Sequence, residues 1–213
     1  MSSKIYIVGM GPGTGEMMTP QADHALCGSD VIVGYPVYLK LLGGKYRKKE
    51  FLSTPMKQEV RRCEMCFEEA EKGKTVAISN VSDPTFGEEI LGKGVAIIPA
   101  EGRIYAPADG TIEMLFDTMH AVSMTTSEGV ELLIHIGLDT VALKGEHFTA
   151  YKGNGDSVKK GELLIEADLD AVKKAGYDVI TPVVVCNTSD YQTVETVTDQ
   201  EVEPGDTVLI LNK

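Results

Sequence analysis

The sequence changes its pattern at about residue 75, and this change limits the folds that the chain can adopt. Before that point strand-like and helix-like segments alternate, and after it short β-favouring runs follow one another, separated by Gly, Pro and Asp-Gly turn signals. Alternating strands and helices favour a parallel sheet, whereas closely spaced short strands favour an antiparallel sandwich or barrel. We therefore expect an α+β protein, with an α/β parallel-sheet segment at residues 1–72 and an all-β antiparallel sandwich or barrel domain at residues 73–213.

The expected elements follow from local signals. A helix should begin at Thr19-Pro20, because Thr is a good N-cap and Pro is tolerated in a first helical turn. A charged amphipathic helix is expected over residues 57–72, ending at Gly73. Along residues 1–78 we expect strands at residues 4–8, 30–34, 51–54 and 75–78. In the second part we expect one short helix at 169–175 and strands at residues 94–98, 102–106, 111–116, 121–125, 130–136, 148–151, 162–165, 179–185, 192–196 and 207–211.

Composition indicates a folded protein without a membrane span. Of the 213 residues 43% are hydrophobic and 24% are charged, which is sufficient for a core. The longest apolar runs, such as residues 130–136, are far shorter than the ~18 residues that a membrane span needs, and the N-terminus does not resemble a signal peptide. The four cysteines (Cys27, Cys63, Cys66 and Cys186) are too few for a disulfide framework, so we expect reduced thiols and a cytoplasmic protein.

Charge is distributed unevenly along the chain. Residues 1–74 contain 11 Lys and Arg against 9 Asp and Glu, whereas residues 75–213 contain 9 against 23. A domain with this acidic excess repels phosphate backbones, so nucleic acid is a poor candidate partner and a basic protein a better one.

Two of the four histidines lie in strand-like sequence and are candidates for chemistry. Alternation in residues 130–136 places His135 and Leu133 on one face of a strand, and His120 precedes the strand at residues 121–125. Pairing of these strands would bring the two imidazoles together. A neutral imidazole is a good nucleophile toward phosphorus at neutral pH, although a half-buried structural histidine is the alternative interpretation.

Residues from about 73 to 213 closely resemble the glucose-type enzyme IIA domain of the phosphoenolpyruvate:sugar phosphotransferase system. The most specific match is Gly129-Val-Glu-Leu-Leu-Ile-His-Ile-Gly-Leu-Asp-Thr-Val141, and further matches lie at residues 81–97, 106–112, 116–121, 155–158 and 181–185. The resemblance implies a phosphotransferase component without a cofactor. His135 would accept a phosphoryl group from the phosphohistidine carrier protein and pass it to a sugar-specific IIB domain. His120 would be the second active-site histidine, and Thr118 would orient it.

The resemblance also implies how the site works. Transfer between two phosphohistidines is near thermoneutral, so positioning and charge neutralisation suffice. Backbone N–H groups of Ile136 and Gly137 are the expected donors to the phosphate. The positions expected to dock the partners are Phe86, Ile90, Leu91, Phe116, Leu133 and Asp139.

The first segment resembles the N-terminal part of the tetrapyrrole methyltransferases of cobalamin biosynthesis, and most closely the precorrin-3B methyltransferase. The matching pieces are residues 4–13, 18–22, 29–35 and 73–77. Their glycine-rich loop implies a vestigial cofactor-binding site at Gly9, Gly11, Pro12 and Gly13. The resemblance ends at about residue 78 and the second domain of that family is absent, so we expect a truncated segment and a joint near residues 73–80.

Other functions stay open at this level. The chain could be an inactive or S-adenosylmethionine-binding or tetrapyrrole-binding methyltransferase fragment. It could also be a lipoyl- or biotin-type binding module, because residues 155–161 resemble the turn that carries the modified Lys in such domains, although no Met-Lys-Met flanks it. A zinc hydrolase would need a third ligand with His-x-His spacing, and the Cys63/Cys66 pair lacks a second pair.

Overall fold

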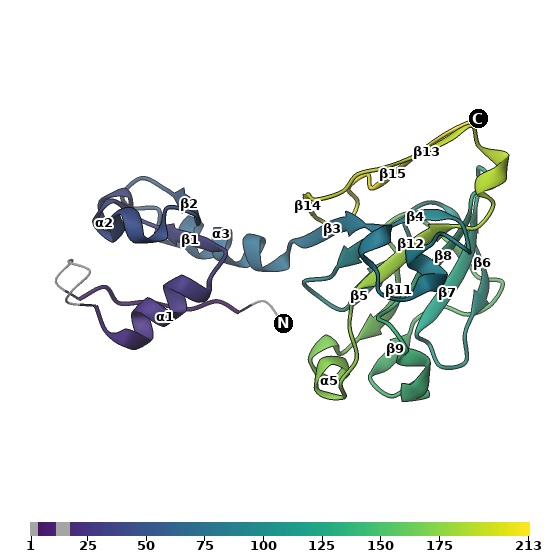
Figure 1. Cartoon of the computed structure of the whole chain (residues 1–213), viewed down its shortest axis with the longest axis horizontal. Coiled ribbons are helices and arrows are strands. Elements are labelled where there is room, and N and C mark those ends of the chain that lie inside the picture. Colours follow the sequence, from purple (N-terminus) through teal and green to yellow (C-terminus); the bar gives the residue numbers. More distant parts are fainter. Residues whose placement is uncertain (1–3, 12–17) are drawn as a thin grey trace. The chain divides into compact units, whose positions relative to one another are not determined.

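The computed structural model of the chain describes residues 4–11 and 18–213. The chain divides into two compact units, one ending at Glu71 and the other beginning at Lys72 (Figure 1). Each unit is described by itself. In neither unit does the described part of the chain contain a helix long and apolar enough to cross a membrane.

The N-terminal unit is a small α/β arrangement around one parallel strand pair. Thr19 caps the first helix, because its hydroxyl accepts a hydrogen bond from the Ala22 N–H at 3.2 Å. Strand β1 pairs in parallel with strand β2. The elements of the N-terminal unit are α1 (Pro20–Gly28), β1 (Val31–Gly34), α2 (Pro36–Leu42), η2 (Gly43–Tyr46), β2 (Glu50–Ser53) and α3 (Glu59–Glu71).

One strand expected in this unit does not form, and one expected strand lies in the second unit. Residues 4–8 do not form a strand, and Ile7 is fully exposed. The expected strand at 75–78 belongs to the other unit as β3 (Gly73–Ala77), where it pairs antiparallel with β4 (Lys93–Ile98). Residues 4–8 therefore have no ladder partner in the described part of the chain, and the parallel sheet there consists of one strand pair.

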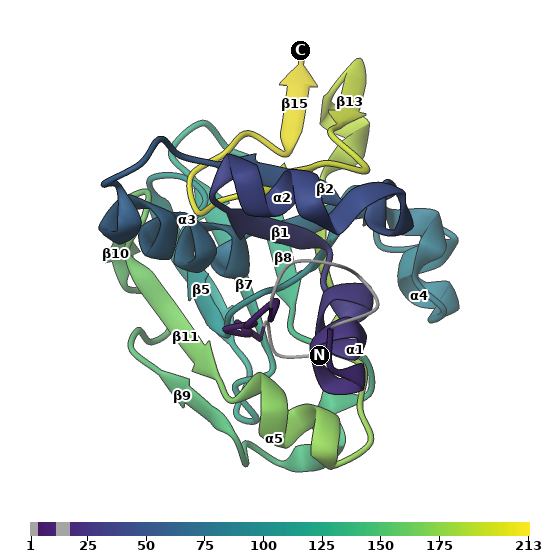
Figure 2. The same cartoon turned by 90° about the vertical axis from the view of Figure 1, so that its left-hand side faces the viewer.

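The second unit is an antiparallel β structure of two stacked sheets and a C-terminal hairpin. Among the described residues, an eight-stranded sheet has the order β10-β6-β7-β8-β12-β4-β3-β14 and a three-stranded sheet the order β5-β11-β9. Figure 2 shows β9 and β11 side by side, and β13 pairs with β15 in the hairpin. The remaining strands are β5 (Arg103–Tyr105), β6 (Gly110–Leu115), β7 (Ala121–Thr126), β8 (Glu131–His135), β9 (Phe148–Ala150), β10 (Ser157–Val158), β11 (Leu163–Ala167), β12 (Thr181–Val185), β13 (Thr193–Thr196), β14 (Glu201–Val202) and β15 (Leu209–Asn212).

The core of this unit lies between the two sheets. Val122 and Ile134 on the large sheet and Ile165 on the small sheet are almost fully buried in one cluster. The sandwich expectation is therefore confirmed, and each strand expected after residue 90 has a counterpart within a few residues. The helices of the second unit are short: η3 (Ile78–Asn80), α4 (Pro84–Gly87), η4 (Thr140–Leu143), α5 (Leu169–Lys174) and η5 (Thr188–Asp190).

Candidate functional site

The two candidate histidines meet where strands β7 and β8 begin and end. His135 is the last residue of β8 and pairs with Ala121, the first residue of β7, so His120 lies directly beside it. The Ile136 N–H donates to the His120 carbonyl oxygen at 2.8 Å, which extends the ladder past the strand end. The imidazole centroids are 4.9 Å apart with an interplanar angle of 84°. Strand pairing thus brings the two rings together, as the sequence predicted.

The backbone fixes the tautomer of His135. Its Nδ1 lies 2.7 Å from the carbonyl oxygen of Gly137. A carbonyl only accepts, so Nδ1 carries the hydrogen and the lone pair of a neutral ring is on Nε2. Burial lowers the pKa of His135, while the Gly137 carbonyl and the charges of Asp83 and Asp139 act in the opposite direction. The neutral ring has one nucleophilic nitrogen, Nε2.

His120 is more deeply buried and also neutral. It is 5% exposed, and its Nδ1 lies 2.5 Å from the Thr118 hydroxyl oxygen. Burial and then the neighbouring His135 lower the pKa of His120 to about 4. The Phe116 ring also contacts the His120 ring in an edge arrangement, with 5.5 Å between the ring centroids. A phosphate placed between the two histidines would therefore meet two uncharged imidazoles.

The turn after His135 is held in a conformation that requires glycine. Gly137 has a φ of 75°, and a Cβ there would lie 2.5 Å from the Asp178 carbonyl oxygen. The same Asp178 carbonyl accepts from the Leu138 N–H at 3.0 Å. The buried Thr140 hydroxyl donates to the Ile136 carbonyl at 2.6 Å. Thr140 and Asp178 thus hold the turn that presents the Gly137 carbonyl to His135.

Sequence reasoning missed Thr140 and Asp178. Thr140 stands inside the matched stretch, and its available signal was a Thr three residues after a glycine, a residue type that often bonds the nearby backbone. Asp178 lies about forty residues further along the chain and no local pattern connects it with the turn. One expected role changes as well, because the Ile136 N–H is bonded to His120 and is not free for a phosphate. Of the two backbone groups expected to donate to the phosphate, the Gly137 N–H is the one that can still serve.

The residues expected to dock partners differ in exposure. Ile90 is 67% exposed, whereas Phe86 is only 4% exposed and its ring centroid is 5.0 Å from that of His135. Leu91, Phe116 and Asp139 are exposed, and Leu133 is partly buried. Phe86 therefore supports the His135 ring from within the fold and, contrary to expectation, does not belong to the exposed set.

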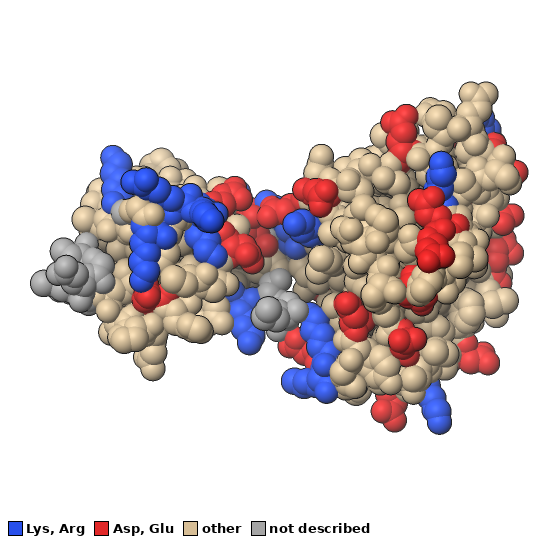
Figure 3. Space-filling model, viewed as in Figure 1, with Lys and Arg blue, Asp and Glu red and all other residues tan. Residues whose placement is uncertain are grey.

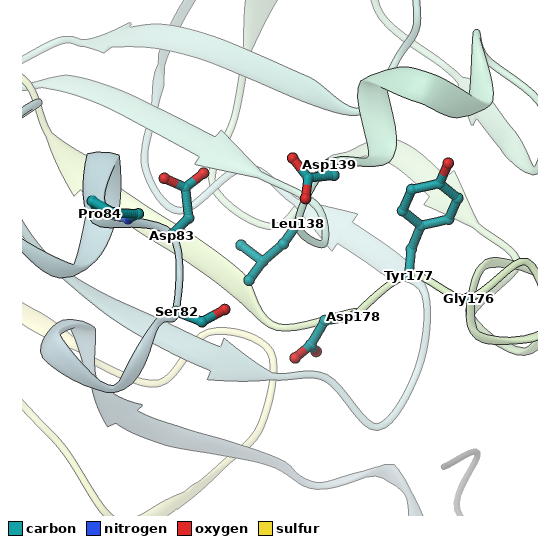
Figure 4. A pocket seen from close by; sticks show the side chains of 8 residues that line it. All are labelled: Ser82, Asp83, Pro84, Leu138, Asp139, Gly176, Tyr177 and Asp178. Carbon is teal, nitrogen blue, oxygen red and sulfur yellow. The ribbon is translucent and has the colours of Figure 1, made fainter.

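A cavity of about 470 Å³ lies in the same unit, and residues with an electrostatic effect on His135 line it (Figure 4). Asp83 caps α4, accepting from the Thr85 N–H at 2.8 Å, and so fixes the short helix that carries Phe86. The cavity is lined by Ser82, Asp83, Pro84, Leu138, Asp139, Gly176, Tyr177 and Asp178. It gives the surroundings of His135 an acidic wall, which favours cationic side chains of a partner.

The glycine-rich segment of the first unit is described only in part. Gly9 has open space where a side chain would be, and Gly11 has a φ of 60°. Pro12 and Gly13 lie outside the described residues. In the described part of the chain no group of three or more His, Cys, Asp or Glu is arranged to hold a metal ion.

The histidine pair at the strand ends of an antiparallel sandwich agrees with what comparisons with known proteins show. Residues 67–191 match the family described as phosphoenolpyruvate-dependent sugar phosphotransferase system, EIIA 1, and the chain belongs to that family. Residues 4–98 match the tetrapyrrole (corrin/porphyrin) methylases, so the N-terminal part is a methylase-like fragment. Both matches include β3, the strand that the structure assigns to the EIIA sheet.

Known relatives agree with this assignment. The glucose-specific EIIA component of Halalkalibacterium halodurans is 44% identical over 141 residues, which are 66% of this chain and 82% of that protein. The glucose permease IIA structure from Mycoplasma capricolum is 36% identical with a TM-score of 0.61, covering 65% of this chain and 89% of that one. The beta-glucoside-specific EIIBCA component of Dickeya chrysanthemi is 46% identical over 62% of this chain, which spans only 21% of that longer protein.

Proposed function

We propose that this chain is a histidine phosphocarrier of the sugar phosphotransferase system. His135 accepts the phosphoryl group from the phosphohistidine carrier protein and passes it to a sugar-specific IIB domain. The observation that supports this most directly is the 2.7 Å contact between His135 Nδ1 and the Gly137 carbonyl, since it leaves Nε2 as the nucleophile.

The transfer balances without a proton leaving the site. The Nε2 lone pair of His135 forms a bond to phosphorus while the phosphorus–nitrogen bond of the donor imidazole breaks in line, and the leaving electron pair stays on that imidazole. The hydrogen on His135 Nδ1 remains bonded to the Gly137 carbonyl throughout. The reverse sequence of bonds delivers the phosphoryl group to the next acceptor.

His120 and Thr118 position the phosphate in this proposal. The neutral His120 ring, 4.9 Å from His135 between centroids, supplies a hydrogen bond to the phosphoryl oxygens and no charge that would trap them. Thr118 orients that ring through its 2.5 Å contact with Nδ1. The Gly137 N–H serves as backbone donor to the phosphate, since the Ile136 N–H is bonded to the His120 carbonyl.

Partner docking uses the exposed apolar residues Ile90, Leu91 and Phe116 together with the acidic side chain of Asp139. An apolar centre with an acidic rim fits a carrier protein whose own surface is basic. The division between Glu71 and Lys72 separates the phosphocarrier part from the methylase-like fragment. This role places the protein in the cytoplasm, where its phosphoryl donor is made.

Incubation with phosphoenolpyruvate and the two general proteins of the system tests the proposal. Mass spectrometry of the intact chain should show one added phosphoryl group, and peptide mapping in alkali should locate it on His135. Phosphate on another residue, or none at all, would contradict the proposal.

A further inference from the structure

The N-terminal unit carries an exposed apolar helix face beside a run of cations. In α2 the side chains of Val37, Tyr38 and Leu41 are 51%, 57% and 46% exposed, while Leu42, the last residue of the helix, is buried. At 100° per residue the exposed three and Lys40 occupy one continuous arc of the helix. An isolated apolar side chain on a surface is ordinary, but a whole arc of a helix is a candidate contact surface.

Five cations follow within ten residues. Lys40, Lys45, Arg47, Lys48 and Lys49 lie in a stretch with no acidic residue between Asp30 and Glu50. Figure 3 shows Lys and Arg side chains gathered on the part of this unit that carries α2 and β2. Lys45 is bound to Asp23 at 2.5 Å, whereas the other four make no ion pair within residues 4–11 and 18–213.

We propose that this basic-apolar surface, defined as the exposed arc of α2 and the cations of residues 40–49, binds the surface of an anionic lipid bilayer. Clusters of about four to eight Lys and Arg are attracted to anionic headgroups, and exposed aliphatic and aromatic side chains insert at the boundary with the acyl chains. Both features occur within residues 37–49 of this unit. The net charge of the whole chain is −12, so the attraction is local to this unit.

The chemistry of the cations favours lipid over an acidic protein. Four of the five are Lys, flexible point charges that suit a diffuse anionic layer, whereas recognition of fixed carboxylates usually relies on the planar fork of Arg. The competing occupant is a second copy of this chain. Its residues 175–212 are acidic and contain no Lys or Arg, so they could pair with the cations of residues 40–49. The experiment therefore separates a bilayer from self-association.

The full chain is mixed with sedimenting vesicles of phosphatidylcholine alone or of phosphatidylcholine with phosphatidylglycerol. We expect binding to the mixed vesicles only, decreasing as salt is added. The double variant Arg47→Glu/Lys48→Glu should weaken that binding at least about tenfold. Val37→Asp/Leu41→Asp should weaken vesicle binding even at low salt, because the charged side chains can no longer insert at the boundary with the acyl chains.

A matched control changes the same charge elsewhere. Lys173→Glu/Lys174→Glu reverses two adjacent cations on α5 of the other unit and should leave vesicle binding unchanged, while circular dichroism verifies that every variant is folded. Equal binding of all variants, equal loss in the control, or no binding to anionic vesicles would overturn the proposal. Salt-sensitive dimers in light scattering that Arg47→Glu/Lys48→Glu abolishes, without vesicle binding, would assign the surface to a second copy instead.

Discussion

The Nδ1 atom of His135 lies 2.7 Å from the carbonyl oxygen of Gly137, two residues ahead of it in the same turn. This contact links the fold to the proposed chemistry, because a carbonyl oxygen can only accept a hydrogen bond, which keeps the hydrogen on Nδ1 and leaves the lone pair on Nε2. The turn itself depends on two hydrogen bonds. The Thr140 hydroxyl donates to the Ile136 carbonyl, and the Asp178 carbonyl accepts from the Leu138 N–H.

The first prediction separates the roles of the two histidines. His135→Gln removes the nucleophile, so it should abolish formation of the acid-labile, alkali-stable phosphate. His120→Gln leaves the nucleophile in place, so it should still accept phosphate but fail to pass it to a IIB domain. Radiolabelling with phosphoenolpyruvate measures both steps, and label retained by the His135→Gln protein would refute the assignment.

The second prediction concerns Thr140. Thr140→Val keeps the shape of the side chain but leaves the Ile136 carbonyl without its buried donor, which should cost about 1–3 kcal/mol of unfolding free energy. It should also slow phosphoryl acceptance, because the turn no longer holds the Gly137 carbonyl firmly against His135. Thr140→Ser retains the hydroxyl and is the control. Nitrogen chemical shifts of the His135 ring report the tautomer, and a Val variant with an unaltered tautomer and rate would show that Thr140 serves stability alone.

The third prediction tests docking. Ile90→Asp introduces a charge at a side chain that is 67% exposed, so it should weaken binding of the carrier protein by about 2 kcal/mol without unfolding the chain. Ile210→Asp, on the exposed face of β15, is the control and should bind normally. Phe86→Asp would instead bury a carboxylate and destabilise the fold. Titration calorimetry with the unphosphorylated carrier measures the affinities, and equal values for Ile90→Asp and the control would remove Ile90 from the interface.

The fourth prediction follows from the pKa of His120, lowered from 6.5 to about 4 by burial and by His135. Because the native state disfavours the proton, the unfolded chain binds it first as the pH falls. The stability that neutral His120 provides is therefore complete above about pH 6.5 and is lost as the pH falls toward 4, by up to about 3 kcal/mol. The difference in unfolding free energy between the wild type and His120→Gln should shrink across this range. A difference that is constant with pH would mean that the pKa is not lowered.

Much of the fold and of the candidate site was predictable from sequence, and the exceptions depend on contacts between residues far apart in the chain. Strand β8 and the pairing that brings His120 to His135 follow from local alternation and from turn signals. The resemblance that begins at about residue 73 places β3 in the EIIA-like domain, but its long-range pairing with β4 is revealed by no local pattern. The contact of Asp178 with the His135 turn is likewise long-range. Residues 4–8 have strand propensity, yet propensity without a partner strand does not make a strand.

The last prediction is that residues 1–72 contribute no catalysis. Methyl transfer requires the donor and acceptor to be held at near-attack distance, an arrangement worth about 7–11 kcal/mol that the resembled family builds from two domains. The fragment here has one parallel strand pair and a buried core of Leu26, Ile32, Leu42 and Tyr46. We therefore expect no specific S-adenosylmethionine binding in calorimetric titration of the intact chain, and micromolar affinity would contradict this.

The same prediction applies to a shortened chain. The site residues His135, His120 and Thr140 all lie in the unit that begins at Lys72, whose first strand, β3, pairs with β4 and β14. A chain that starts at Lys72 keeps these pairings, so it should accept phosphate at close to the full rate, with some loss of stability. Circular dichroism first establishes that it is folded. If a folded chain of this kind no longer accepted phosphate, the first unit would be part of the site.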